Sequence, residues 1–266
     1  MASFERYIGV DYSGAETAES SLKSIRVFVA TPATEPLEQF TRSGPLTMRN
    51  QPRYWSRERV AKWLHERLSD GTPTLVGIDH VFSFPLTFFE KHGLAREWPM
   101  FLDHFQRHCP TDMRSTYVDF VREGACGAWQ KVTGDPKWLR LTETWTATAK
   151  SVFQLDVQGA VAKSSYAGIP WLRYLRGEGT SKIHFWPFDG WDVPQGYSVV
   201  AEVYPSLWMK RFPRQDRNGD QHAAYAVAAW LRRADLDGSL PEFFQPHLNP
   251  DERKIAAIEG WILGVV

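Results

Sequence analysis

The sequence predicts an α/β fold, in which a mixed sheet is flanked by helices and interrupted by a helical insertion. Short apolar runs rich in β-branched residues alternate with stretches whose apolar residues recur at helical spacing. Two of the apolar runs end in the same pattern, Gly9-Val10-Asp11 and Gly77-Ile78-Asp79. From about residue 85 to residue 150, helical segments follow one another without a strand. We therefore expect a single domain over residues 1–266 that carries an insertion at about 85–150.

Composition narrows the class of protein. Of the 266 residues, 43% are hydrophobic and 23% are charged, as in a globular protein that buries a substantial core. Lys+Arg and Asp+Glu both number 31, and this balance argues against nucleic-acid binding through bulk charge alone while permitting a local basic groove. No signal peptide and no apolar stretch of membrane-spanning length is visible, and Cys109 and Cys126 lack metal-ligand spacing. We expect a cytoplasmic protein without a membrane segment.

The first third of the chain predicts strands around one helix. Arg6–Asp11 has the character of a buried strand, Lys23–Thr31 alternates as a strand does, and residues 32–54 contain a further strand or hairpin. Ser56 is suited to cap a helix that runs to about Ser69. The next strand, Thr74–Asp79, repeats the features of the first.

The rest of the chain adds helices and two strands. The insertion contains three predicted helices, at Leu86–Lys91, Trp98–His108 and Ser115–Arg122. Phe153–Gly177 predicts two helices bent near Pro170, because the residue before a proline disfavours the helical conformation. The remaining elements are strands at Ile183–Trp186 and Tyr197–Pro205, an alanine-rich helix from Gly219 to about Gly238, and a short helix within Asp251–Val265.

Four acidic residues are the candidate catalytic and metal-binding residues, namely Asp11, Asp79, Glu202 and Asp220. The first three lie at or near strand ends, where α/β sheets bind ligands, and Asp220 opens a helix. Clustered carboxylates repel one another unless protons or cations intervene, and their oxygen atoms suit Mg²⁺ or Mn²⁺. Two such ions activate a water and stabilise the leaving oxygen in phosphodiester cleavage.

Each of these acids also has a structural interpretation. Asp11 and Asp79 precede turns and suit Asx-turns, and aspartate is a preferred N-cap residue, as Asp220 would be. Glu202 is harder to explain in this way, because glutamate is depleted in strands and rarely buried unpaired. His80 adjoins Asp79, but adjacent strand residues face opposite sides of a sheet, so we interpret His80 as structural.

The motifs Gly9-Val10-Asp11, Gly77-Ile78-Asp79, Glu202-Val203-Tyr204-Pro205 and the helix from Asp220 to Trp230 resemble those of a family of predicted nucleases, the family catalogued as domain of unknown function 429. The resemblance spans nearly the whole chain in order, including the segment around Gly168-Ile169-Pro170. It implies a ribonuclease-H-like fold with a mixed five-stranded sheet and acids gathered at its centre.

The chain departs from this family in the last motif. That motif typically reads Asp-x-x-Asp-Ala-Tyr in the family, and Ala223 stands here where the second acid would be. Asp220 and His222 are the candidate substitutes, although His222 would point away from Asp220 on a regular helix. The departure weakens or removes a second metal site.

Four basic residues are the candidate substrate-binding residues, namely Lys150, Lys163, Arg173 and Arg176. They would form a phosphate-binding rim, with Trp171 or Tyr174 as a platform for base stacking. The alternative is an ordinary amphipathic helix with solvated charges, which a run of charges more often represents.

The sequence therefore supports two main hypotheses of function. The first is a metal-dependent phosphodiesterase, a nuclease that hydrolyses DNA or RNA with Mg²⁺ or Mn²⁺ held by the four acids. The second is a catalytically silent scaffold of the same fold that binds nucleic acid or protein, which Ala223 and the balanced charge motivate. A third, an ATPase of actin-like architecture, would require a nucleotide-binding motif that the sequence does not show.

Overall fold

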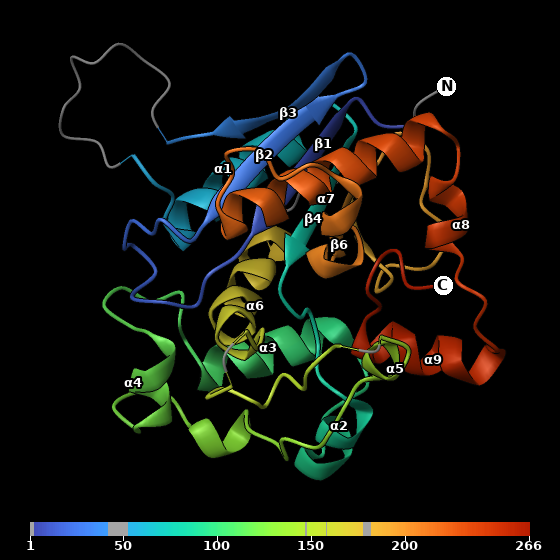
Figure 1. Cartoon of the computed structure of the whole chain (residues 1–266). Coiled ribbons are helices and arrows are strands. Elements are labelled where there is room, and N and C mark those ends of the chain that lie inside the picture. The colour runs from blue at the N-terminus through green and yellow to red at the C-terminus, as the bar shows by residue number, and fades with distance from the viewer. Residues whose placement is uncertain (1–2, 42–52, 147, 158, 178–181) are drawn as a thin grey trace.

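Six strands form one mixed sheet in the computed structural model, which describes residues 3–41, 53–146, 148–157, 159–177 and 182–266 (Figure 1). The strands are β1 (Arg6–Asp11), β2 (Arg26–Thr31), β3 (Thr34–Gln39), β4 (Thr74–Asp79), β5 (Ile183–Trp186) and β6 (Ser198–Glu202). Their order is β3-β2-β1-β4-β6-β5, antiparallel from β3 to β1 and parallel from β1 to β5. The predicted α/β class is confirmed. The five strands implied by the resemblance are wrong for the described residues, because β5 extends the sheet beyond β6.

Helices cover both faces of this sheet (Figure 1). The α-helices of the described residues are α1 (Arg57–Ser69), α2 (Leu86–His92), α3 (Trp98–His108), α4 (Val118–Arg122), α5 (Leu141–Thr144), α6 (Ala162–Gly177), α7 (Gly219–Leu236), α8 (Leu240–Phe244) and α9 (Pro250–Glu259), with short 3-10 turns at Trp129–Lys131, Pro205–Leu207 and Met209–Arg211. One core lies between the sheet, α1, α6 and the insertion, and a second lies between the sheet, α7 and the C-terminal segment. Within the described ranges, no helix has the length and apolarity needed to cross a membrane.

The helical insertion shares the first core and packs on it through aromatic rings. The ring of Phe84 lies 4.9 Å from that of Phe88, 5.4 Å from that of Phe105 and 5.5 Å from that of Tyr166 in α6, measured between centroids. Such edge and tilted contacts hold the insertion against the sheet through α6. The predicted helices at Leu86–Lys91 and Trp98–His108 are confirmed, and α4 begins three residues later than predicted.

Helix α6 corrects one prediction. The two bent helices expected within Phe153–Gly177 are instead one helix that begins at Ala162 and contains Pro170. A proline has no N–H, so the carbonyl of Tyr166, four residues earlier, loses its helical partner. The hydroxyl of Thr111 donates to that carbonyl at 2.8 Å, which satisfies the group and allows the helix to continue through Pro170.

The repeated Gly-x-Asp pattern has a packing cause. A Cβ on Gly9 would lie 2.2 Å from the carbonyl oxygen of Ala224 in α7, and one on Gly77 would lie 2.8 Å from Val227. Only glycine therefore allows α7 to lie this close to β1 and β4. Because strand residues two apart share a face, Asp11 and Asp79 leave the sheet on the same side as α7.

Candidate functional site

The structure brings Asp11 and Asp79 together at the carboxyl ends of β1 and β4. The two residues are partners in the parallel ladder, and the interaction of their carboxyl groups raises the pKa of Asp11 and lowers that of Asp79. Two carboxylates placed this way repel each other when both are ionised, so the pair favours a state in which they share one proton. Burial raises the pKa of both groups: that of Asp11 rises further beside the charges of Asp79 and Asp220, and that of Asp79 reaches about 7 with the charge of Glu202 nearby.

Asp220 lies close enough for its charge to raise the pKa of Asp11. It is the second residue of α7, and the N-cap is Asn218, whose side chain accepts from the amide of Gln221. The interpretation of Asp220 as a helix cap is therefore wrong. Asp220 precedes Ala224 by one turn, and Ala224 packs on Gly9, so the start of α7 lies over the end of β1.

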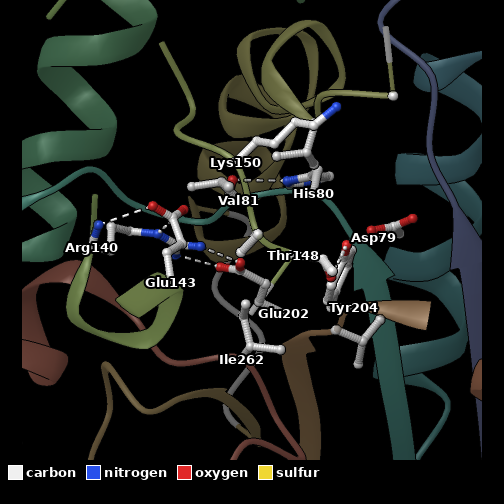
Figure 2. Close-up of a pocket in the computed structure, with 14 residues that line it drawn as sticks. Asp79, His80, Val81, Arg140, Glu143, Thr148, Lys150, Glu202, Tyr204 and Ile262 are labelled. Atoms are coloured by element: carbon white, nitrogen blue, oxygen red, sulfur yellow. Dashed lines mark hydrogen bonds and ion pairs between the residues drawn. The ribbon is translucent and has the colours of Figure 1, made fainter. Parts of the chain in front are cut away.

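Glu202 does not join the two aspartates. It pairs with Ile78, one residue before Asp79, so its side chain leaves the opposite face of the sheet. There, Nη1 and Nη2 of Arg140 donate to its two carboxylate oxygens at 2.8 and 2.5 Å, and the amide of Phe82 donates at 3.0 Å. Figure 2 shows the Glu202 carboxylate directed toward Arg140, with Asp79 apart from it. Its charge still reaches Asp79, but both of its oxygens are engaged.

Arg140 is a component of the site that the sequence did not predict. It is fully buried in the insertion, and its Nε also donates to Glu143 at 2.9 Å. The guanidinium of Arg140 thus donates hydrogen bonds to two buried carboxylates, those of Glu202 and Glu143. Burial raises the pKa of Glu143. With Asp79, Lys150 and others, these residues line a cavity of about 40 Å³, which has room for a few water molecules (Figure 2).

Neither of the two histidines near the acids is placed as a ligand. The Nδ1 atom of His80 contacts the Val81 carbonyl oxygen at 3.0 Å, and burial lowers the pKa of His80 to about 4, so the ring is neutral. The Nε2 atom of His222 contacts the Met209 carbonyl oxygen at 3.0 Å, which fastens the preceding segment to α7. His222 therefore does not replace the acid that Ala223 lacks.

The predicted basic rim is not assembled as one surface. Lys150 lies beside the Asp79 cavity, and Lys163 lines a separate cleft of about 640 Å³, where it pairs with Asp119 at 2.7 Å. Arg173 and Arg176 lie farther along α6 and pair with acids on the insertion side and after β5, Asp103 at 2.6 Å and Asp189 at 2.8 Å. Of the predicted stacking residues, Trp171 is only 8% exposed, which leaves no free ring face of the kind a base needs.

A second cation that the sequence did not predict stands next to Asp11. Arg26 is the cross-strand partner of Asp11 in β2, and its charge lowers the pKa of that aspartate. It is 6% exposed, and its Nη1 donates to Glu38 at 2.7 Å. The sequence feature that could have indicated Arg26 as a neighbour of the site is its position at the start of a strand that pairs with β1.

The aspartate pair is the part of this site that suits a metal ion. Across the described ranges, no three His, Cys, Asp or Glu side chains form a group that could hold one. Magnesium is, however, commonly held by one or two carboxylates together with water and substrate phosphates. Asp11 and Asp79 meet that requirement, whereas Glu202 does not contribute while Arg140 binds it.

Comparison of the chain with protein-family models, curated proteins and solved structures found no match. The resemblance to the nuclease family therefore stays a prediction, and the function is argued from the geometry of the site.

Proposed function

We propose that the protein is a metal-dependent phosphodiesterase that cleaves nucleic acid, with Mg²⁺ or Mn²⁺ bound by Asp11 and Asp79. The observation that carries this proposal is the pair of half-buried carboxyl groups at the ends of two adjacent parallel strands. The two carboxylates repel each other when both are ionised. A divalent cation bound in place of the shared proton relieves that repulsion.

The surrounding residues support this chemistry. A bound divalent cation polarises a phosphoryl oxygen and lowers the pKa of a water. Asp220, at the start of α7, places a further acceptor near Asp11 that is suited to orient a water. Arg26, on the other side of Asp11, lowers the pKa of that aspartate and so favours the ionised form that binds a cation. Arg140 balances the negative charge of Glu202, whose side chain leaves the face of the sheet opposite to the aspartate pair.

The test is a cleavage assay with labelled single-stranded, duplex, hybrid and branched nucleic acids. Each substrate is incubated with Mg²⁺, with Mn²⁺ and with a chelator. We expect cleavage by the parent with either metal, and a loss of about a hundredfold or more in Asp11→Asn and Asp79→Asn, because each removes a ligand of the cation. Asp103→Asn, which removes a surface acid paired with Arg173, is the matched control and should retain activity. A parent that cleaves none of these substrates would contradict the proposal.

A silent scaffold is the second candidate, and one observation favours it. Of the four predicted acids, Asp11 and Asp79 lie together and Asp220 lies near Asp11, but Arg140 binds Glu202. Ala223 also supplies no carboxylate where the resemblance implies a further acid. Calorimetry with Mn²⁺ separates the candidates. The nuclease predicts binding that is lost in Asp79→Asn and kept in Glu202→Gln, whereas the scaffold predicts no dependence of binding on Asp79.

A further inference from the structure

A surface of stacked arginine and aromatic side chains borders the aspartate pair. We define this arginine–aromatic surface as Phe40, Arg53, Tyr54, Arg217 and Tyr225. The guanidinium of Arg53 lies 5.1 Å from the ring centroid of Phe40 and 5.6 Å from that of Tyr54. The guanidinium of Arg217 lies 3.6 Å from the ring centroid of Tyr225. Each arginine therefore lies over an aromatic ring and places a cationic group next to it.

Contacts among side chains connect the two ends of this surface and join it to the site. The ring centroid of Tyr54 lies 5.0 Å from the guanidinium of Arg26, the partner of Asp11. Arg26 pairs with Glu38, which also accepts from Nε2 of Gln221 at 2.8 Å. Tyr225 follows Gln221 by one turn of α7 and lies on the same side of that helix. The contacts thus run from Tyr54 through Arg26, Glu38 and Gln221 to the turn of α7 that carries Tyr225.

The segment that precedes α7 is rich in positive charge, and its Arg214 lies beside Arg217 of this surface, donating from Nε to the Arg217 carbonyl at 2.8 Å. Residues 209–217 contain four basic residues, Lys210, Arg211, Arg214 and Arg217, and one acid, Asp216. The first three are exposed, and the described residues provide no ion-pair partner for them. This contrasts with Arg173 and Arg176 on α6, which pair with acids. The segment is fastened to α7 by the contact between Met209 and His222.

We infer that the arginine–aromatic surface binds single-stranded nucleic acid and leads it to the aspartate pair. Unpaired bases stack on aromatic rings and guanidinium planes, and exposed cations contact the phosphates between them. A duplex would hide the base faces, so the stacked planes favour a single strand. A protein partner also uses arginine and aromatic anchors, but the excess of unpaired positive charge favours a phosphate backbone. The inference rests on the proposed function, because that function explains why the strand ends at Asp11 and Asp79.

Binding is measured apart from cleavage, by fluorescence anisotropy in a chelator, with a labelled single strand of about 12 nucleotides and with its duplex. The double variant Arg53→Ala/Arg214→Ala removes two surface charges, and Arg173→Ala/Arg176→Ala is the matched control on α6. We expect the first to weaken binding about tenfold and to reduce the salt slope by about 1.4, since each contact to a single-strand phosphate contributes about 0.7. The control should stay within about twofold of the parent.

The stacking contribution has its own pair of variants. Tyr54→Ala should weaken binding of the single strand, and Tyr54→Phe, which keeps the ring, should restore it. The inference would be overturned by an equal loss of binding in both double variants or by tighter binding of the duplex than of the single strand. It would also be overturned if the protein bound no oligonucleotide, a result that would favour a protein partner. Binding without cleavage would overturn the proposed function alone. Metal-dependent cleavage that Arg53→Ala/Arg214→Ala leaves intact would overturn this inference alone.

Discussion

Among single residues, Asp11 and Asp79 couple the chemistry of the site to the stability of the chain. Both groups have a raised pKa, so the folded chain binds a proton more tightly than the unfolded chain does. The free energy of unfolding of the metal-free protein should therefore fall as the pH rises from about 4 through about 7, the value that the pKa of Asp79 reaches.

Asp79→Asn tests this coupling, because an uncharged amide cannot repel Asp11 and can donate a hydrogen bond to it. In a chelator at pH 8, we expect the variant to be more stable than the parent by on the order of 2 kcal/mol, and the difference to vanish near pH 4. Chemical denaturation at a series of pH values measures both chains. A parent whose stability rises over this range would contradict the shared-proton arrangement.

The predictability of the site also follows from single residues. The repeated Gly-x-Asp pattern placed Asp11 and Asp79 correctly, because in-register parallel strands bring equivalent positions together. Glu202 was expected beside them, but a register that pairs it with Ile78 turns its side chain to the other face. Arg140 lies 62 residues before Glu202, and no local sequence pattern predicts an ion pair over that separation.

At the scale of secondary structure, local signals were reliable where local interactions decide the structure. Ser56 caps α1 and accepts from the amide of Arg59, as its residue type predicts. Strand β4 begins and ends as predicted, since its apolar run is bounded by turn residues. Helix α6 was misjudged because its continuity at Pro170 depends on Thr111, which is distant in sequence.

This explanation of α6 predicts a coupling between Thr111 and Pro170. Thr111→Val leaves the buried carbonyl of Tyr166 without a donor and should lower the free energy of unfolding by about 1–3 kcal/mol. In a Pro170→Ala background the new N–H supplies that donor, so the same substitution should cost less by about 1 kcal/mol. Denaturant titrations of the four chains measure this cycle. Additive costs would show that Thr111 does not compensate for the proline.

In the molecule as a whole, the end of α9 holds the insertion to the sheet. The carboxylate of Glu259 accepts from the amide of Leu86 at 2.5 Å and from that of Leu141 at 2.6 Å, the first residues of α2 and α5. The carbonyl of Glu259 also accepts from Arg140 at 3.2 Å. Because the first amides of a helix have no partner within it, one carboxylate satisfies both helix starts and stabilises their dipoles.

Glu259→Ala should therefore loosen α2 and α5 together, although they lie about 55 residues apart in the chain. We expect their amides to exchange hydrogen about tenfold faster or more, and the free energy of unfolding to fall by about 1–3 kcal/mol. Asp251→Ala, which removes an exposed acid at the start of α9, is the control and should leave this exchange unchanged. Faster exchange in only one of the two helices would show that Glu259 does not couple them. The expected joint response would mean that the C-terminal helix fixes the insertion, and with it Arg140, behind the aspartate pair.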